Sequence, residues 1–143
     1  MTPEERLRAF LDAMLTWERR VSPIFVQSTL AEMQAETVPL LAIFAEHLTE
    51  KGRSSKEWGK KIHPKNGIPT CVADGQYDQE IERVAPTLRK TTFYAFTRWR
   101  PDPAMVYRYK IVVDEQGEAH VDEMRYGSVV GGKPPEKWRS YTY

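Results

Sequence analysis

The first part of the chain places apolar residues with the period of an α-helix. They recur at intervals of three and four, at Leu7, Phe10, Leu11, Met14, Trp17 and Val21. This spacing puts them on one helical face, the face that packs on a core. Thr2, Pro3 and Glu5 have the residue types of a capping box with proline at the first helical position. We therefore expect a helix that begins after Thr2 and continues to Val21.

Two more helices are predicted before residue 52. Ser22 and Pro23 repeat the cap-and-proline pattern, so a second helix is expected to start there and run through Met33 towards Thr37. A proline deep inside a helix removes a backbone hydrogen bond, so we place the start of a third helix near Pro39. That helix carries a dense apolar run and is expected to stop at Gly52.

From Thr70 onward the apolar pattern changes to the period of two that is typical of strands. Residues 76–85 and 91–99 each predict a strand, and residues 106–127 predict two strands joined by a turn at 114–117. We expect an α+β fold, with N-terminal helices packed on a curved antiparallel sheet. We expect a single domain, 1–143. It would comprise a helical part (2–52), a basic connector (51–69), a sheet (70–130) and an aromatic tail (131–143).

Composition narrows the class of protein. The chain has 143 residues, 41% of them hydrophobic and 29% charged, as in an ordinary globular domain. A single cysteine excludes an intrachain disulfide and a cysteine-rich metal site. No apolar run reaches transmembrane length, and "MTPEERLRAF" lacks the apolar core of a signal peptide. We expect a cytoplasmic protein with no membrane partner.

Candidate catalytic residues are few. His120 and Asp122 share a strand face by parity, and Tyr107 and Tyr109 could lie opposite them across the turn, which would allow acid–base chemistry. A spacing of two along a strand is a weak motif, and solvated strand faces often carry it. The three histidines lack the close spacings of zinc sites, and there is no glycine-rich phosphate loop. We expect no enzyme activity and no catalytic, cofactor-binding or metal-binding residue.

Basic and aromatic residues alternate on the predicted strands, as they do on platforms that bind single-stranded nucleic acid. Arg98, Arg108 and Arg125 stand near Tyr94 and Phe96 in this pattern. However, residues 114–123 hold five acids and no Lys or Arg, and such a run would repel a phosphate backbone. The net charge of +1 also shows no basic excess. We expect no nucleic-acid partner.

Charge is segregated along the chain. Residues 51–65 carry six basic residues and one acidic residue, whereas the run at 114–123 is acidic. Opposite patches suit a protein partner of mixed charge, although loops are also charged simply because they are solvated. Trp, Tyr and Arg dominate interface hot spots. The expected partner-binding residues are Trp58, Arg108, Asp114, Glu115, Glu118, Asp122, Glu123, Arg125, Trp138 and Tyr141.

Three amphipathic helices, a loop and long strands that end in "GEAHVDEMRY" resemble the cone-shaped nuclear transport factor two-like fold. The short chain, long N-terminal helices and aromatic tail are most similar to the immunity proteins of bacterial polymorphic toxin systems. The resemblance implies a protein that neutralises a cognate toxin in a tight complex, with a homodimer through the sheet as an option. The alternative is a small-molecule enzyme or ligand binder that uses the cone interior. An immunity protein could instead fill that interior with Phe93, Trp99, Ile111 and Val113.

Overall fold

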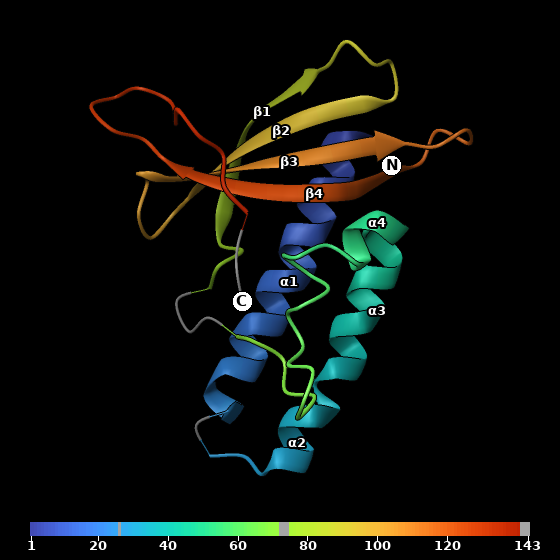
Figure 1. The fold of residues 1–143 in the computed structure, drawn as a ribbon, viewed down its shortest axis with the longest axis vertical. Coiled ribbons are helices and arrows are strands. Elements are labelled where there is room, and N and C mark those ends of the chain that lie inside the picture. Colours follow the sequence, from blue (N-terminus) through green and yellow to red (C-terminus); the bar gives the residue numbers. More distant parts are fainter. Residues whose placement is uncertain (26, 72–74, 141–143) are drawn as a thin grey trace.

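The computed structural model describes residues 1–25, 27–71 and 75–140, which form two layers: helices on one face of an open, four-stranded antiparallel sheet (Figure 1). The helices are α1 (Pro3–Phe25), α2 (Leu30–Ala35), α3 (Thr37–His47) and α4 (Glu50–Arg53). The strands are β1 (Gln79–Pro86), β2 (Thr92–Trp99), β3 (Met105–Val113) and β4 (Ala119–Ser128). This arrangement confirms the predicted α+β class.

Helix α1 begins as its sequence predicts but ends later. The backbone N–H of Glu5 donates to Thr2 Oγ1 at 3.2 Å, and that of Thr2 donates to Glu5 Oε1 at 3.0 Å, which completes the capping box. The predicted break at Ser22 is wrong, because α1 continues through Pro23 to Phe25. Proline lies there in the last turn, so its missing N–H interrupts the hydrogen bonding only at the helix end.

The second helix is short and the third ends early. Helix α2 spans only Leu30–Ala35 and is capped by Thr29, whose side chain accepts from the N–H of Glu32. Helix α3 starts two residues before Pro39, close to the predicted position, but it does not reach Gly52. Leu48 adopts an extended conformation and pairs in parallel with Val121 of β4. The edge of the sheet therefore replaces the helix as the hydrogen-bonding partner of this segment.

The sheet has the strand order β1–β2–β3–β4, and each strand is antiparallel to the next. The predicted strands at 76–85, 91–99 and within 106–127 are all present, with β1 starting at Gln79. Register shifts interrupt the sheet between Ile81 and Arg83 on β1, and beside Lys110 on β3. At the second shift Asp122 has no directly paired partner, so the alternation of faces along β4 changes at this residue.

The core lies between the helices and one face of the sheet. Its α1 side is formed by Leu7, Phe10 and Met14, each 0% exposed, and the sheet contributes buried residues from three strands, Ala95, Tyr109, Ile111, Val121 and Met124. Among the residues proposed to fill a cone interior, Ile111 is fully buried, and Trp99 and Val113 pack partly buried against this core. Phe93 is half-buried and lines a small surface pocket beside Val113.

The basic connector contributes to the core instead of forming a solvated loop throughout. Trp58 is 1% exposed and its Nε1–H donates to the hydroxyl of Tyr77 at 2.9 Å. Lys61 is 0% exposed, and its Nζ lies 5.7 Å from the ring centroid of Trp17 and 5.8 Å from that of Tyr77. Within the described residues no helix is both long and apolar enough to cross a membrane.

Candidate functional site

The face of the sheet that points away from the helices carries the candidate site (Figure 1). Successive side chains of a strand point to opposite faces. Ala95 and Thr97 of β2 are buried on the helical side, so Tyr94 and Phe96 lie on the outer face. Along β3, Tyr109 is buried and its neighbour Arg108 is outward by the same alternation. The outer face is therefore basic and aromatic at its centre.

Strand pairing aligns three arginines and one phenylalanine across the whole sheet. Arg83 of β1 is opposite Phe96 of β2, Phe96 is opposite Arg108 of β3, and Arg108 is opposite Arg125 of β4. We call Arg83, Arg108 and Arg125 the arginine row. Adjacent strands lie about 4.8 Å apart, so the row is about 14 Å long. Like charges directly opposite one another, as in Arg108 and Arg125, are destabilising.

Aromatic rings support two members of the arginine row. The guanidinium of Arg83 lies 4.3 Å from the ring centroid of Phe96. The guanidinium of Arg108 lies 4.6 Å from the centroid of Tyr94 and 5.3 Å from that of Trp138. Each such cation–π contact is worth about 0.5–1 kcal/mol at an exposed site. Stacking uses the flat face of a guanidinium and leaves its N–H edge for an acceptor.

The cations of the outer face differ in whether they are neutralised. Arg125 binds Glu123 at 2.6 Å, and Arg98 binds Glu82 at 3.0 Å. For Arg83 and Arg108, by contrast, no carboxylate within the described part of the chain lies at ion-pair distance. The Nε of Arg108 is buried and has no hydrogen-bond acceptor among the described residues. Arg83 on the edge strand β1 and Arg108 on β3 thus keep hydrogen-bonding capacity for a ligand.

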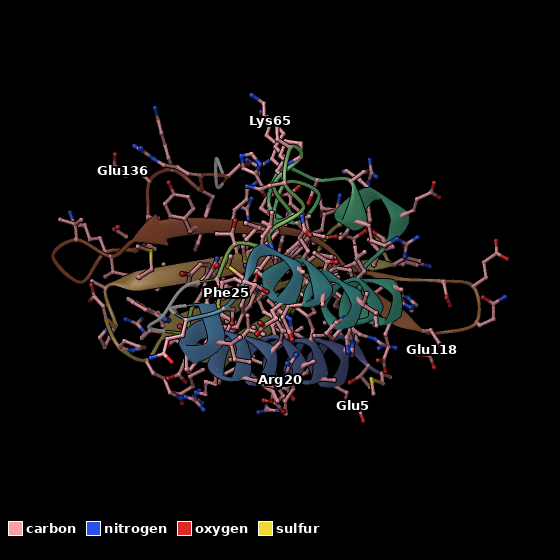
Figure 2. The ribbon with its side chains drawn as sticks, turned by 90° about the horizontal axis from the view of Figure 1, so that it is seen from below. Glu5, Arg20, Phe25, Lys65, Glu118 and Glu136 are labelled. Atoms are coloured by element: carbon pink, nitrogen blue, oxygen red, sulfur yellow. The ribbon has the colours of Figure 1, made fainter. Side chains whose placement is uncertain are left out.

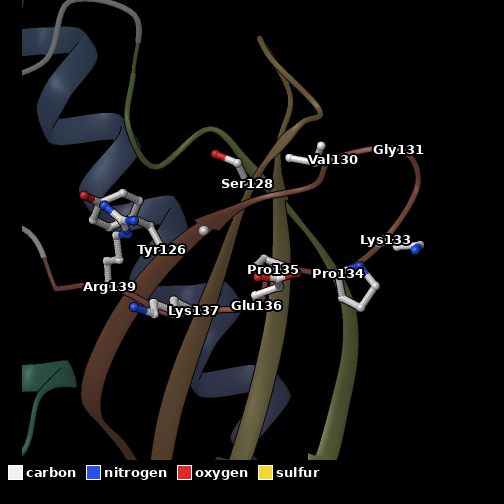
Figure 3. Close-up of a pocket in the computed structure, with 11 residues that line it drawn as sticks. Tyr126, Ser128, Val130, Gly131, Lys133, Pro134, Pro135, Glu136, Lys137 and Arg139 are labelled. Carbon is white, nitrogen blue, oxygen red and sulfur yellow. The ribbon is translucent and has the colours of Figure 1, made fainter.

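The C-terminal tail folds back onto this face. Val130 and Lys133 pair across a tight turn at two glycines that have positive φ angles. Further on, the N–H of Arg139 donates to the carbonyl of Tyr126 at 2.8 Å, and the N–H of Tyr126 donates back at 2.9 Å. Figure 3 shows this segment beside Tyr126 of β4. The pairing holds Trp138 against Phe96, with ring centroids 5.9 Å apart.

Two hollows flank the tail. One, of about 500 Å³, lies between the tail and the outer face and is lined by Arg83, Phe96, Arg98 and Trp138, among others. The second, of about 1140 Å³, is the open space within the tail loop, where Lys133, Lys137 and Arg139 outnumber Glu136 (Figure 3). The first hollow is also lined by Glu82, which pairs with Arg98, so Arg83 is the cation of its wall that has no carboxylate partner among the described residues. The second has a basic wall, which suits anionic or hydrogen-bond-accepting groups of a partner.

The structure separates the predicted partner-binding residues into two groups. Arg108, Arg125 and Trp138 come together at the arginine row. Trp58 does not join them, because it is a connector residue buried in the core and has almost no exposed surface for a partner. Tyr141 lies outside the described residues. The remaining residues of the set belong to the acidic run.

Most of the acidic run makes contacts within the molecule. Asp114 Oδ1 accepts from the N–H groups of Gln116 and Glu118, each at 2.9 Å, and so stabilises the turn. Glu118 lies 2.9 Å from the amino group of Met1 and 3.4 Å from Arg6; Figure 2 shows it at the same end of the molecule as Glu5. Hydrogen bonding to that amino group lowers the pKa of Glu118.

Asp122 and Glu123 are also engaged. Asp122 Oδ1 accepts from the hydroxyl of Thr49 at 2.6 Å, and its Oδ2 lies 3.8 Å from the Nζ of Lys51 and of Lys110. Because the side chain of Asp122 is only 8% exposed, it acts as an anchor between β4 and the start of α4. Of the five acids, Glu115 alone is exposed and makes no ion pair or side-chain hydrogen bond with the described residues.

The candidate acid–base residues are divided between two environments. Tyr107 and Tyr109 are buried on the helical side, paired with Tyr126 and Met124 respectively. The hydroxyl of Tyr109 donates to Gln79 Oε1 at 2.8 Å. His120 pairs with Val112 nearer the turn. Asp122 is bonded to Thr49, so the four candidate residues do not come together in one site.

A second histidine is buried at the end of α3. His47 is 4% exposed, and Arg6 Nη1 lies 3.0 Å from its Nδ1. Burial lowers the pKa of His47, and the charges of Arg6 and His120 add to this effect while Glu46 opposes it. No group of three or more His, Cys, Asp or Glu able to hold a metal ion occurs in the described part of the chain.

The partner-binding residues expected from the sequence did not include Arg83 or Phe96, although Phe96 belongs to the alternation of basic and aromatic residues. Arg83 is aligned with Phe96 only because a register shift follows Ile81. Without this shift the parity of β1 would be different, and a residue-by-residue count along the strand misses it. The alternation of Arg98 and Arg108 with aromatic residues was the signal that could have led to the outer face.

No protein-family model matches the chain, and no curated protein and no solved structure is significantly similar to it.

Proposed function

We propose that this chain is a binding protein that holds another protein on the outer face of its sheet and on its tail. The observation that carries the proposal is that Arg83 and Arg108 are stacked on aromatic rings and lack a carboxylate partner among the described residues. Trp138 lies over the same centre. Arginine, tryptophan and tyrosine are the residue types that contribute most to protein interfaces.

The energetics of the free protein support this proposal. The opposed charges of Arg108 and Arg125, of which only Arg125 has a carboxylate partner, and the buried Nε of Arg108 without an acceptor both cost stability, and neither is needed to form the open sheet. A partner that supplies acceptors removes these costs when it binds. The hydrogen bonds that it forms are charge-assisted and therefore stronger than neutral ones, so they add to the binding free energy. The outer face is thus better suited to a complex than to the free chain.

Within this class, we propose an immunity protein that neutralises a cognate bacterial polymorphic toxin in the cytoplasm. The small α+β fold with helices on one face of the sheet supports a nuclear transport factor two-like cone as the finer description. The filled core between helices and sheet supports binding by the surface, with no catalytic residue, cofactor or metal. A homodimer through the sheet would occupy the same face, so the toxin and a second copy would compete for it.

The direct test is co-expression of the full chain with the toxin encoded beside it in the same operon. We expect growth to be restored and the two proteins to elute as one stoichiometric complex. The double variant R83A/R108A should lose protection, whereas R8A, a change at an exposed arginine of α1, should retain it. Full protection by R83A/R108A, or protection without a complex, would contradict the proposal.

A further inference from the structure

We infer that Arg83 and Arg108 of the arginine row bind carboxylates, so that the partner presents an acidic segment to the outer face; this inference rests on the proposed function. The sequence analysis placed the five acids of residues 114–123 among the expected partner-binding residues. That run is largely engaged within the fold, at Thr49, Arg6 and Arg125. The cations that remain available lie at Arg83 and Arg108.

The geometry of these two arginines suits carboxylate recognition. Arg83 is exposed at the wall of the pocket of about 500 Å³ beneath the tail, and its guanidinium lies over the ring of Phe96. A planar guanidinium offers parallel N–H groups that match the two oxygens of a carboxylate. Arg108 is held between Tyr94 and Trp138 in the same way, with its Nε lacking an acceptor.

The separation of the two arginines sets the shape of the ligand. Arg83 and Arg108 stand on strands that are two apart, so their backbones are separated by about 9–10 Å. Two carboxylates on the same face of a partner strand or helix are about 5–7 Å apart, a distance that two long arginine side chains can bridge. An acidic segment with one exposed face can therefore engage both arginines together.

Carboxylates fit this face better than a nucleic-acid backbone. The rings of Phe96 and Tyr94 are already stacked with guanidinium groups, which occupy faces that bases would use. Glu82 and Glu123 lie on strands of the same sheet, paired with Arg98 and Arg125, and a continuous phosphate chain would pass close to them. A net charge of +1 provides little general attraction to any polyanion, acidic peptide or nucleic acid, so binding depends on the contacts at Arg83 and Arg108.

The experiment compares two anionic probes on the full chain at near-physiological ionic strength. Labelled poly-L-glutamate and a single-stranded oligothymidylate of matched net charge are titrated by fluorescence anisotropy. We expect poly-L-glutamate to bind more tightly than the oligothymidylate. R83A/R108A should weaken its binding by about tenfold or more, since truncating a paired charge at an interface commonly costs at least that factor. R8A should change it by less than about twofold.

A second variant keeps the result interpretable if the alanine double variant is poorly folded. R83K/R108K retains both charges but loses the planar fork and its stacking, so we expect binding to fall between wild type and R83A/R108A. Equal weakening by R8A and R83A/R108A would overturn the inference. Tighter binding of the oligothymidylate, lost when Tyr94 and Phe96 are replaced by alanine, would assign the face to nucleic acid and overturn it as well.

The outcomes separate this inference from the proposed function. If the cognate toxin binds but poly-L-glutamate does not, the face recognises the toxin by other chemistry, and only the inference about carboxylates fails. If poly-L-glutamate binds through the arginine row while no toxin is neutralised, the carboxylate site stands and the immunity function fails.

Discussion

Gly127 of β4 and Pro135 of the tail are in direct contact. A Cβ atom added to Gly127 would lie 2.6 Å from both Cβ and Cγ of Pro135, closer than real Cβ contacts allow. Glycine is needed at this position because a second segment approaches closely, and not because the backbone angle is unusual. This approach brings the tail low over the sheet and lets Trp138 reach Phe96 and Arg108.

We therefore expect G127A to displace the tail without unfolding the sheet. Overpacking commonly costs about 1–3 kcal/mol, and here the strain can be relieved by release of Pro135. The amide hydrogens of Tyr126 and Arg139, which bond the tail to β4, should then exchange faster with solvent. S128A, at the exposed neighbouring position, serves as the control. Unchanged exchange at both amides in G127A would show that the tail accommodates the methyl group.

Asp122 is expected to contribute to stability and not to partner binding. Replacing it by alanine removes the acceptor of Thr49 and the ion pairs with Lys51 and Lys110. D122A should lower the free energy of unfolding by about 1–3 kcal/mol, the usual cost of an unsatisfied buried group, as measured by urea denaturation. E115A, in the same run but on the surface, should change it by less than about 0.5 kcal/mol. Equal effects of the two variants would show that the bulge at Asp122 is not an anchor.

His47 is expected to make stability fall in mild acid. Its pKa in the folded protein is lowered, chiefly by burial, from the ordinary value of 6.5. As pH falls below 6.5 the unfolded chain takes up a proton that the folded protein resists, so stability present above this pH is progressively lost. The effect should continue until the pH passes the lowered pKa of the folded state.

The measurement is the urea midpoint between about pH 7.5 and pH 5.5, where few carboxylates titrate. The wild-type midpoint should fall over this range, and H47Q should show a smaller fall, because glutamine cannot take up the proton. H63Q, at an exposed histidine, should behave as the wild type. Glu118 does not interfere, since its pKa is lowered from 4.5 and it titrates below this window. An identical slope in H47Q would exclude His47 as the titrating group.

Local patterns predicted the elements of this fold well. The helical period up to Val21, the capping box at Thr2 and Glu5, and the alternation in residues 91–99 each depend on neighbours in the sequence. Such signals reflect local backbone and burial preferences, which is why the capping bonds and the strands appear where they were expected.

The candidate site depends on strand register and on contacts between residues far apart in the sequence, which local sequence patterns do not contain. The break after His47 arises because Leu48 pairs with the edge strand, and the position of Arg83 opposite Phe96 arises from a register shift. Trp58 lies in a segment rich in lysine, yet it is buried, with its Nε1–H bonded to the hydroxyl of Tyr77 nineteen positions further along the chain. Only the folded arrangement shows which aromatic residues remain at the surface.

The dissociation constant of the toxin complex, measured for the full chain and for a chain lacking residues 136–143, tests the role of the outer face most directly. Trp138 is half-buried and lies outside the main core, so the truncated chain should melt only slightly below the full chain. Its affinity for the toxin should fall by at least about tenfold, because the anchor over Arg108 is lost. A truncated chain that folds and binds the toxin as tightly as the full chain would contradict a partner site on this face.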